Sequence, residues 1–364
     1  MRTRIDYLRF HCGIAILVRT FMIRRLLLLA ALSGSVAVPA FSQQVNLTGA
    51  GSTFANPLYT AWASEYAKLH PGTQINYQSI GSGGGISQLT NGIVDFGGTD
   101  APMTDAQLAT AHDKLHTQIV HFPVALGAVV PIYNIPGVNA ELNFTGKALA
   151  GIYLGTITKW NDPEIAKANP GVKLPANDIV VCHRAEASGT TFIWVDFLSK
   201  VSADWKSKVG AAASVNWPTG IGGKGNEGVS GFVRQTPNSI GYVELIYAVQ
   251  NKMSYGQVQN AAGKFIKANL NSVTEAAGGA VKGMPDDFRV SITNAPGAGS
   301  YPVSSFTWML IPMDAKDKTK GAALKAFLTW GITEGQKACQ PLTYAPLAKP
   351  VVDKELAALK YIHY

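Results

Sequence analysis

The sequence predicts an α/β protein of two lobes, and three observations support this prediction. Short apolar runs alternate with segments whose apolar residues recur at helical spacing, a pattern typical of a mostly parallel sheet covered by helices. Several of these runs end in turns rich in Gly, Ser and Thr. The chain has 364 residues, a length that favours two domains, and breaks near Asn134 and Tyr301 indicate two crossings between them.

Residues 1–42 have the features of a secretory signal peptide. The basic pair Arg24-Arg25 precedes the apolar run Leu26–Leu32, which is too short to span a bilayer as a stable helix. The stretch Ala40-Phe41-Ser42 places small residues at positions −3 and −1 of a cleavage site, so we expect cleavage after Ser42 and export. An overcalled start before Met22 and a single longer anchor that includes Phe10–Val18 remain open alternatives.

The charge of the exported part gives no indication of a nucleic-acid partner. The whole chain carries a formal charge of +8, but residues 1–42 hold six arginines and one aspartate. Without this segment the charge is about +3, which is too small to predict nucleic-acid binding.

The exported part opens with three units of the same kind, each a strand followed by a small-residue turn and a helix. The strands are expected over residues 45–48, 74–78 and 94–98, and the helices over 57–69, from 86 and from 104. The glycines at 81–85 could indicate a dinucleotide fingerprint, but the acidic residue that this motif needs further on is missing. A flexible loop is the alternative interpretation of these glycines.

A fourth turn of this kind lies at Arg184–Thr190, between the apolar run Ile179–Cys182 and a helix that begins near Ser188 or Gly189. The unpaired N–H groups of a first helical turn suit an anion, and hydroxyls and a guanidinium add further donors. The spaced glycines and following lysine of a P-loop are absent. The stretch therefore predicts an anion cradle, with an ordinary helix cap beside a surface arginine as the alternative.

The four turns are predicted to converge. Ligands of parallel α/β sheets bind at the carboxyl ends of the strands, and Thr53, Ser82, Asp100 and Arg184–Thr190 all follow predicted strands. We therefore expect them to contact one ligand.

The rest of the chain is predicted from simpler patterns. We expect a strand over 119–130 that Pro131–Gly137 breaks, a helix over 146–154, a glycine loop at 220–226 that is either phosphate-binding or mobile, strands over 239–244 and 302–311, and helices over 318–331 and 353–361. Cys182 and Cys339 are expected to be free thiols. His112 and His116 lack a third ligand nearby, so we interpret them as a solvated helix face and expect no metal site.

Several of these motifs together resemble the phosphate-binding subunit of the phosphate ABC transporter. They extend in order over essentially all of the exported chain: Leu47–Phe54, Ile80–Gly85, Val94–Pro102, Ile152–Gly155 with Lys159–Asp162, Arg184–Thr190, Gly222–Asn226 and Ile240–Glu244. The resemblance implies a two-lobed periplasmic binding protein of the type II-like class, with two hinge crossings and the ligand in the interlobe cleft. It implies one lobe formed by residues 43–134 and 302–364, and a second lobe formed by residues 135–301.

The resemblance also implies the residues that bind phosphate. Carried over position by position, they are Thr53 and Phe54 through backbone N–H groups, Ser82, Asp100, Arg184, Ser188, Gly189 and Thr190, with Glu186 supporting Arg184. Glu186-Ala187 replaces a frequent Asp-Gly, and Gly83 replaces a second Ser, but neither change removes a ligand donor. The implied partners are inorganic phosphate and the membrane permease subunits, in the periplasm, with a monomeric protein and no cofactor.

Asp100 indicates how the ligand would be selected. A carboxylate repels a fully ionised oxyanion such as sulfate, but it can accept a hydrogen bond from the proton that phosphate keeps near neutral pH. Three alternatives remain: a binder of another tetrahedral oxyanion, a secreted serine hydrolase or phosphatase that uses Ser188 with His183, and an adhesion or scavenging protein on the same fold. The hydrolase lacks the G-x-S-x-G elbow.

Overall fold

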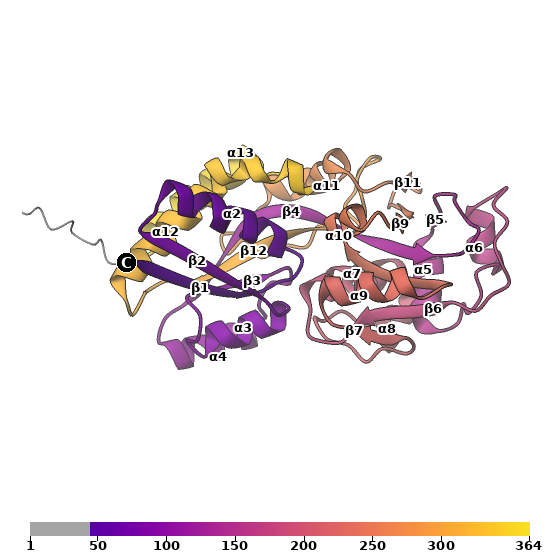
Figure 1. The fold of residues 1–364 in the computed structure, drawn as a ribbon, viewed down its shortest axis with the longest axis horizontal. Coiled ribbons are helices and arrows are strands. Elements are labelled where there is room, and N and C mark those ends of the chain that lie inside the picture. Colours follow the sequence, from indigo (N-terminus) through magenta and orange to yellow (C-terminus); the bar gives the residue numbers. More distant parts are fainter. Residues whose placement is uncertain (1–43) are drawn as a thin grey trace, which may run out of the picture. The chain divides into compact units, whose positions relative to one another are not determined.

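The computed structural model describes residues 44–364 (Figure 1). The predicted signal peptide and its cleavage site lie outside these residues. The main sheet has nine strands, in the spatial order β2-β1-β3-β12-β4-β8-β6-β7, with β9 also paired to β4. Its strands are β1 (Val45–Gly51), β2 (Thr73–Ser79), β3 (Phe96–Thr99), β4 (Ile119–Asn134), β6 (Val180–Arg184), β7 (Ile221–Gly223), β8 (Ser239–Glu244), β9 (Ser254–Tyr255) and β12 (Ser304–Pro312).

Strand β4 joins the two parts of the sheet. Its residues 119–128 pair antiparallel with β12, and its residues 129–134 pair antiparallel with β8. The predicted break at Pro131 is therefore wrong, because the strand continues to Asn134. Proline tolerates the extended backbone, and the Pro131 carbonyl accepts a hydrogen bond from the Gly256 N–H.

The first part of the sheet consists of β1, β2, β3, β12 and the start of β4. The helices around it are α2 (Asn56–Leu69), α3 (Ser82–Thr90), α4 (Asp105–Leu115), α12 (Lys318–Ile332) and α13 (Lys349–Ala358), with short 3-10 turns at Glu334–Ala338, Gln340–Leu342 and Leu359–Tyr361 (Figure 1). The fully buried Trp62 of α2 packs edge-on against Phe327 and Trp330 of α12. These rings attach the two helices to each other and form much of the local core.

The second part of the sheet consists of β6, β7, β8 and the end of β4. Its helices are α5 (Gly146–Leu154), α6 (Pro163–Ala168), α7 (Gly189–Val201), α8 (Ala203–Lys208), α9 (Gly225–Gln235) and α10 (Leu245–Gln250). A small sheet of β5 (Asn143–Phe144), β10 (Gln257–Gln259) and β11 (Phe265–Ile266) lies beyond them. Trp194 of α7 stacks on Tyr242 of β8, which attaches the helix to the sheet.

Residues 270–301 contact both parts. Helix α11 (Leu270–Lys282) packs against β12 and β4. Beyond it, the Phe288 carbonyl accepts a hydrogen bond from Trp308 of β12, whereas Lys200 of α7 donates to Thr293. This return segment therefore bridges the two parts of the sheet beside β4.

Most predicted elements are present, but three differ in addition to β4. Helix α3 begins at Ser82 rather than near Ile86, because Gly81 alone completes the turn with a φ of +86°. Helix α13 begins at Lys349 rather than Asp353, because Pro350 occupies its first turn. The 220–226 loop forms β7 and the start of α9.

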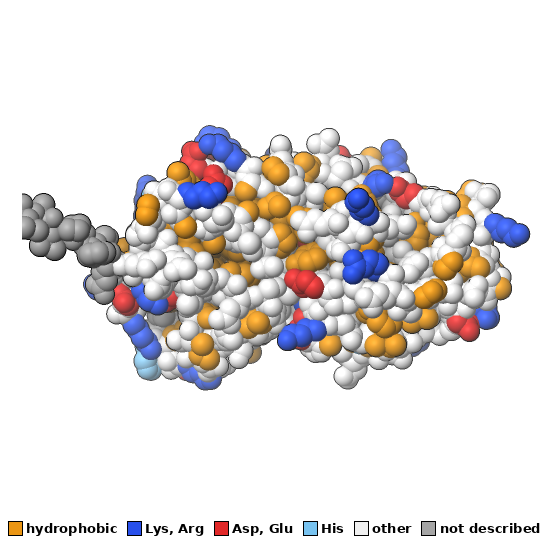
Figure 2. Space-filling view, viewed as in Figure 1, with side chains coloured by type: hydrophobic (Ala, Val, Ile, Leu, Met, Phe, Trp, Pro, Cys, Tyr) orange, Lys and Arg blue, Asp and Glu red, His pale blue; other side chains and the backbone are white. Residues whose placement is uncertain are grey.

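The prediction of two free thiols is confirmed within residues 44–364. Cys182 and Cys339 are free and buried. His112 lies in the last turn of α4 and His116 is its left-handed C-cap, and no group of three His, Cys, Asp or Glu side chains in this range could hold a metal. No helix in the range is long and apolar enough to cross a membrane. On the face shown in Figure 2, the Lys and Arg side chains are scattered among acidic and apolar ones rather than gathered into one patch.

Candidate anion-binding site

The candidate site lies where parallel strands end and helices begin. Strands β1, β2 and β3 run parallel in the first part of the sheet, and β6, β7 and β8 run parallel in the second. Each of these six strands is followed by a helix, from β1 to α2, β2 to α3, β3 to α4, β6 to α7, β7 to α9 and β8 to α10. The amino termini of these helices carry partial positive charge, so their convergence favours an anion.

The first part of the sheet contributes three of the predicted residues from two helix starts. Thr53 and Phe54 lie between β1 and α2, and Ser82 is the first residue of α3. All three are buried, with exposed fractions of 3% or less.

The second part contributes the turn between β6 and α7. Arg184 is the last residue of β6, and Ser188 is the N-cap of α7. The Ser188 Oγ accepts a hydrogen bond from the Thr191 N–H, at 3.2 Å, and so keeps its own proton free to donate. Gly189 and Thr190 form the first turn and are buried.

Hydrogen bonds join the two sets of residues directly. The Gly189 N–H donates to the Ser82 Oγ at 3.1 Å, and the Gly83 N–H donates to the Ala187 carbonyl at 3.0 Å. The structure therefore brings the predicted turns at Ser82 and Arg184–Thr190 together, although more than 100 residues separate them in the sequence.

Asp100 follows β3 and is 1% exposed. Its Oδ1 accepts hydrogen bonds from the Ser52 Oγ at 2.5 Å and the Thr307 Oγ1 at 2.7 Å, while its Oδ2 lies 3.4 Å from the Ser82 Oγ. Burial raises the pKa of Asp100 to about 6, against the opposing effects of these hydroxyls and of the Arg184 charge. The carboxylate therefore has one saturated oxygen and one that faces the other site residues.

Arg184 is the main cation of the site and is held from one side. Its Nε and Nη2 both donate to the Glu186 Oε1, which also accepts from the Gly225 N–H at 3.0 Å. The Nη1 is buried and has no hydrogen-bond partner among the described residues. A buried guanidinium nitrogen without an acceptor is costly, so it indicates the place of an anionic ligand.

Three residues that the sequence analysis did not select also belong to the site: Ser52, Thr307 and Asn226. Ser52 lies inside the quoted motif before Thr53, and Asn226 ends the quoted glycine motif, so both carried a detectable signal. Thr307 carried none, because it reaches Asp100 through strand pairing across more than 200 residues.

The Ser188 and His183 pair of the hydrolase alternative has a different geometry. The His183 ring stacks on Trp217 at 4.7 Å, and its Nδ1 lies 3.0 Å from the Arg184 carbonyl. The Ser188 hydroxyl instead caps α7. Both contacts are typical of packing and capping rather than of a nucleophile and its base.

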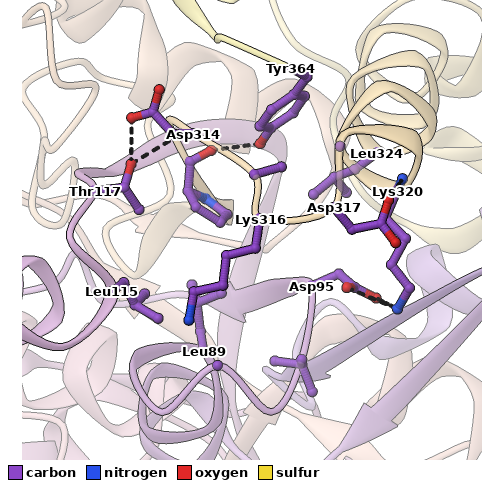
Figure 3. A pocket seen from close by; sticks show the side chains of 15 residues that line it. Leu89, Asp95, Leu115, Thr117, Asp314, Lys316, Asp317, Lys320, Leu324 and Tyr364 are labelled. Atoms are coloured by element: carbon purple, nitrogen blue, oxygen red, sulfur yellow. Dashed lines mark hydrogen bonds and ion pairs between the residues drawn. The ribbon is translucent and has the colours of Figure 1, made fainter.

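A separate pocket of about 350 Å³ lies at the opposite end of β3 (Figure 3). Asp95 and Asp314 are in its wall, Asp95 paired with Lys320 at 3.1 Å and Asp314 with the Thr117 hydroxyl at 2.9 Å. Its floor includes Leu115 and Leu324. Lys316 and Lys320 also line the pocket, so its charges are mixed, and its described residues offer no buried unpartnered donor comparable to the Arg184 Nη1.

The fold and the site define the class as a two-lobed ligand-binding protein whose site lies at the carboxyl ends of its parallel strands. Residues 37–334 match the model of the PBP superfamily domain. The phosphate-binding protein PstS of Xylella fastidiosa strain Temecula1 is 45% identical over 312 residues, which cover 85% of this chain and 84% of that protein. The PstS of Pasteurella multocida is 43% identical over 340 residues, which cover 93% and 96%.

Two solved structures share the fold. The phosphate-binding protein of Stenotrophomonas maltophilia aligns with a TM-score of 0.67 at 21% identity, over 86% of this chain and 93% of that one. An ABC-type phosphate transport receptor of Vibrio cholerae aligns with a TM-score of 0.53 at 20% identity, over 83% and 100%. The chain belongs to the PBP superfamily and, within it, to the family of PstS phosphate-binding proteins.

Proposed function

We propose that this protein binds inorganic phosphate reversibly in the periplasm and delivers it to the membrane permease subunits of a phosphate ABC transporter. It would act as a binding protein and not as an enzyme. The names of its relatives support phosphate as the ligand, and that of the Vibrio cholerae receptor supports the transporter.

The observation that carries the proposal is the unpartnered Nη1 of Arg184. Glu186 takes the N–H of Nε and one N–H of Nη2, so both N–H groups of Nη1 and the second N–H of Nη2 are left for a ligand. Arg184 ends β6, and the first turn of α7 follows it, where the Ser82 Oγ lies 3.1 Å from the Gly189 N–H. A tetrahedral oxyanion would satisfy all of these groups at once.

Asp100 favours phosphate over sulfate. Its Oδ1 is saturated by two hydroxyl donors, which leaves the Oδ2 as the acceptor for a ligand proton. Hydrogen phosphate and dihydrogen phosphate carry such a proton, whereas sulfate does not. Sulfate would therefore place an anionic oxygen against a buried carboxylate.

The proposed ligand set is Thr53, Phe54, Ser82, Asp100, Arg184, Ser188, Gly189 and Thr190, with Glu186 in support. The first lobe would comprise residues 43–134 and 302–364, and the second residues 135–301. Closure would bend the segments between them, with β4 and the return segment near Tyr301 as the hinge. A signal peptide cleaved after Ser42 would place the protein in the periplasm.

Calorimetric titration of phosphate-stripped protein, first with phosphate and then with sulfate, tests the proposal. We expect tight binding of phosphate and none of sulfate, and sulfate binding in Asp100→Asn, because the amide no longer repels it. Absence of heat with phosphate in the wild-type protein would overturn the proposal. Phosphate binding with sulfate still rejected by Asp100→Asn would preserve the function and remove the role given to Asp100.

A further inference from the structure

We propose that Asn226 is a positioning residue that turns the hydroxyl protons of Thr53 and Thr190 toward the ligand. This inference rests on the proposed function and adds a residue that determines the direction of two ligand donors. Asn226 is fully buried and is the second residue of α9.

The orientation of the Asn226 amide is determined by its neighbours. Its Oδ1 accepts a hydrogen bond from the Glu244 N–H at 2.9 Å, and a backbone N–H can only donate. The amide nitrogen must therefore face the other way, where the Nδ2 lies 2.7 Å from the Thr53 Oγ1 and 3.2 Å from the Thr190 Oγ1. The Asn226 N–H also donates to the Thr53 Oγ1, at 3.3 Å.

This arrangement makes both threonine oxygens acceptors of protein hydrogen bonds. A hydroxyl has one proton, and an oxygen that accepts from an amide directs its own proton elsewhere. Within residues 44–364 neither hydroxyl donates to a protein acceptor. Thr191 differs, because its hydroxyl is paired with the Tyr242 hydroxyl at 2.6 Å.

The two threonines come from different parts of the sheet. Thr53 precedes α2 and Thr190 lies in the first turn of α7, so one amide orients a donor from each proposed lobe. The protons that remain free are available to an anion that lies between the helix starts. Asn226 thus makes the Thr53 and Thr190 hydroxyls donors for a ligand, which complements the acceptor oxygen of Asp100.

The test is a double-mutant cycle for phosphate affinity with Asn226→Ala and Thr190→Val. We expect each single change to weaken binding about tenfold or more, because a hydrogen bond to an anion is lost or misdirected. In the Thr190→Val protein, the Thr190 proton no longer exists, so Asn226→Ala should cost at least fivefold less than it costs in the wild-type background. A purely structural role for Asn226 would give the same fold-loss in both backgrounds.

Two further variants keep the test decisive. If Asn226→Ala does not fold, Asn226→Leu fills the same buried space without a donor and enters the same cycle. Asn169→Ala is the matched control. The buried Asn169 amide donates to the Asn143 and Ile165 carbonyls beside β5 and α6, so its loss should leave affinity unchanged.

The outcomes separate the two proposals. Phosphate binding with a coupled cycle supports the role of Asn226. If phosphate binds but the loss of affinity in the double variant equals the product of the two single losses, within twofold, the role of Asn226 is overturned. The proposed function then still stands. A wild-type protein that does not bind phosphate overturns the proposed function and this inference with it.

Discussion

Asp100 is buried in the candidate site, and its raised pKa makes phosphate affinity depend on pH. Because burial raises the pKa of Asp100 to about 6, the ligand-free protein takes up a proton there as the pH falls through that value. With that proton on its free oxygen, Asp100 can no longer accept a hydrogen bond from the P–OH group of phosphate. Phosphate binding must therefore release the proton from Asp100.

We therefore predict that phosphate affinity falls by up to about tenfold for each pH unit below about 6, relative to Asp100→Asn. The comparison with the variant removes the titration of phosphate itself, which affects both proteins equally. Calorimetric titrations between pH 5 and 8 measure it. Parallel pH profiles of the two proteins would contradict the prediction.

The planar guanidinium group of Arg184 has a role that lysine cannot take over. Lysine would keep the charge but cannot donate to Glu186 and a ligand from one planar group. We expect Arg184→Lys to weaken phosphate binding by about 30-fold or more, since hydrogen bonds to charged groups contribute about 1.5–3 kcal/mol each.

Arg234→Lys is the matched control, because Arg234 lies on the exposed side of α9. This variant should bind phosphate as the wild-type protein does. Equal affinity of the two variants would refute the role of the Arg184 fork. Circular dichroism of both variants checks that the fold is kept.

At the scale of elements, the start of α3 fits closely against the turn that precedes α7. A Cβ on Gly83 would lie 2.4 Å from the Ala187 Cβ, well inside the contact distance of two methyl groups. The same two residues share the hydrogen bond from the Gly83 N–H to the Ala187 carbonyl. The approach of α3 to this turn therefore requires glycine at one of the two positions.

We predict that Gly83→Ser weakens phosphate binding about tenfold, because about 1–3 kcal/mol of overpacking opposes the closed arrangement. The second change Ala187→Gly should restore affinity to within about threefold, since it removes the methyl group that clashes. Calorimetric titration of the single and double variants measures both effects.

Gly231→Ser is the control, because a Cβ at Gly231 has no neighbour within 4 Å. If Gly83→Ser binds as the wild type does, or if Ala187→Gly does not rescue it, the fit between these elements is not what limits closure.

Strand pairing explains why Thr307 reaches the site. The register of β12 against β4 shifts between Thr307 and Trp308, and the Thr307 hydroxyl donates to Asp100 at the end of β3. A local irregularity in one strand thus orients a side chain on its neighbour. Nothing in the residues around 307 indicates this partner.

At the scale of the whole molecule, one buried acid lies outside the site. Glu355 of α13 is fully buried, and neither of its carboxyl oxygens has a hydrogen-bond partner among the described residues. Burial raises the pKa of Glu355 well above the ordinary value for glutamate. Over the pH range between the two pKa values, the folded protein therefore holds a proton on Glu355 that the unfolded chain has released.

Because the folded pKa is raised, Glu355 lowers the stability as the pH rises above the ordinary glutamate value. We predict that Glu355→Gln increases the free energy of unfolding of the ligand-free protein by about 1–3 kcal/mol at pH 8, with a smaller gain at pH 5. Urea unfolding at both pH values measures the difference.

Glu334→Gln is the control, because Glu334 is exposed and its ion pair in the described part of the chain is with Lys337. This substitution should change the stability by about 0.5 kcal/mol or less. A variant Glu355→Gln that is less stable than the wild type at pH 8 would show that the carboxylate has a stabilising role.

Sequence patterns predicted those parts of the molecule that depend on neighbouring residues. The helix over 146–154 and the capped start of α7 at Ser188 follow from local spacing, turns and capping residues. The four small-residue turns were predicted to converge because parallel strands place their carboxyl ends at one edge. The family could also be predicted from the sequence, because its motifs occur in order along the chain.

The extent of β4 and the surroundings of Asp100 could not be predicted in this way. Pro131 indicates a break by itself, but the long pairing with β12 and β8 carries the strand through it. Asp100 takes its hydrogen bonds from Ser52 and Thr307, and its pKa from being buried among them.

The sequence alone determined the class of fold, the family and the chemical nature of the ligand donors, since these depend on residue types and their local spacing. Only the tertiary structure decided which nitrogen of Arg184 is left free, which way the Asn226 amide faces and how closely Gly83 approaches Ala187. Each of these depends on atoms that are far apart in the chain, and the direction of a hydrogen bond is defined only when both partners are in place.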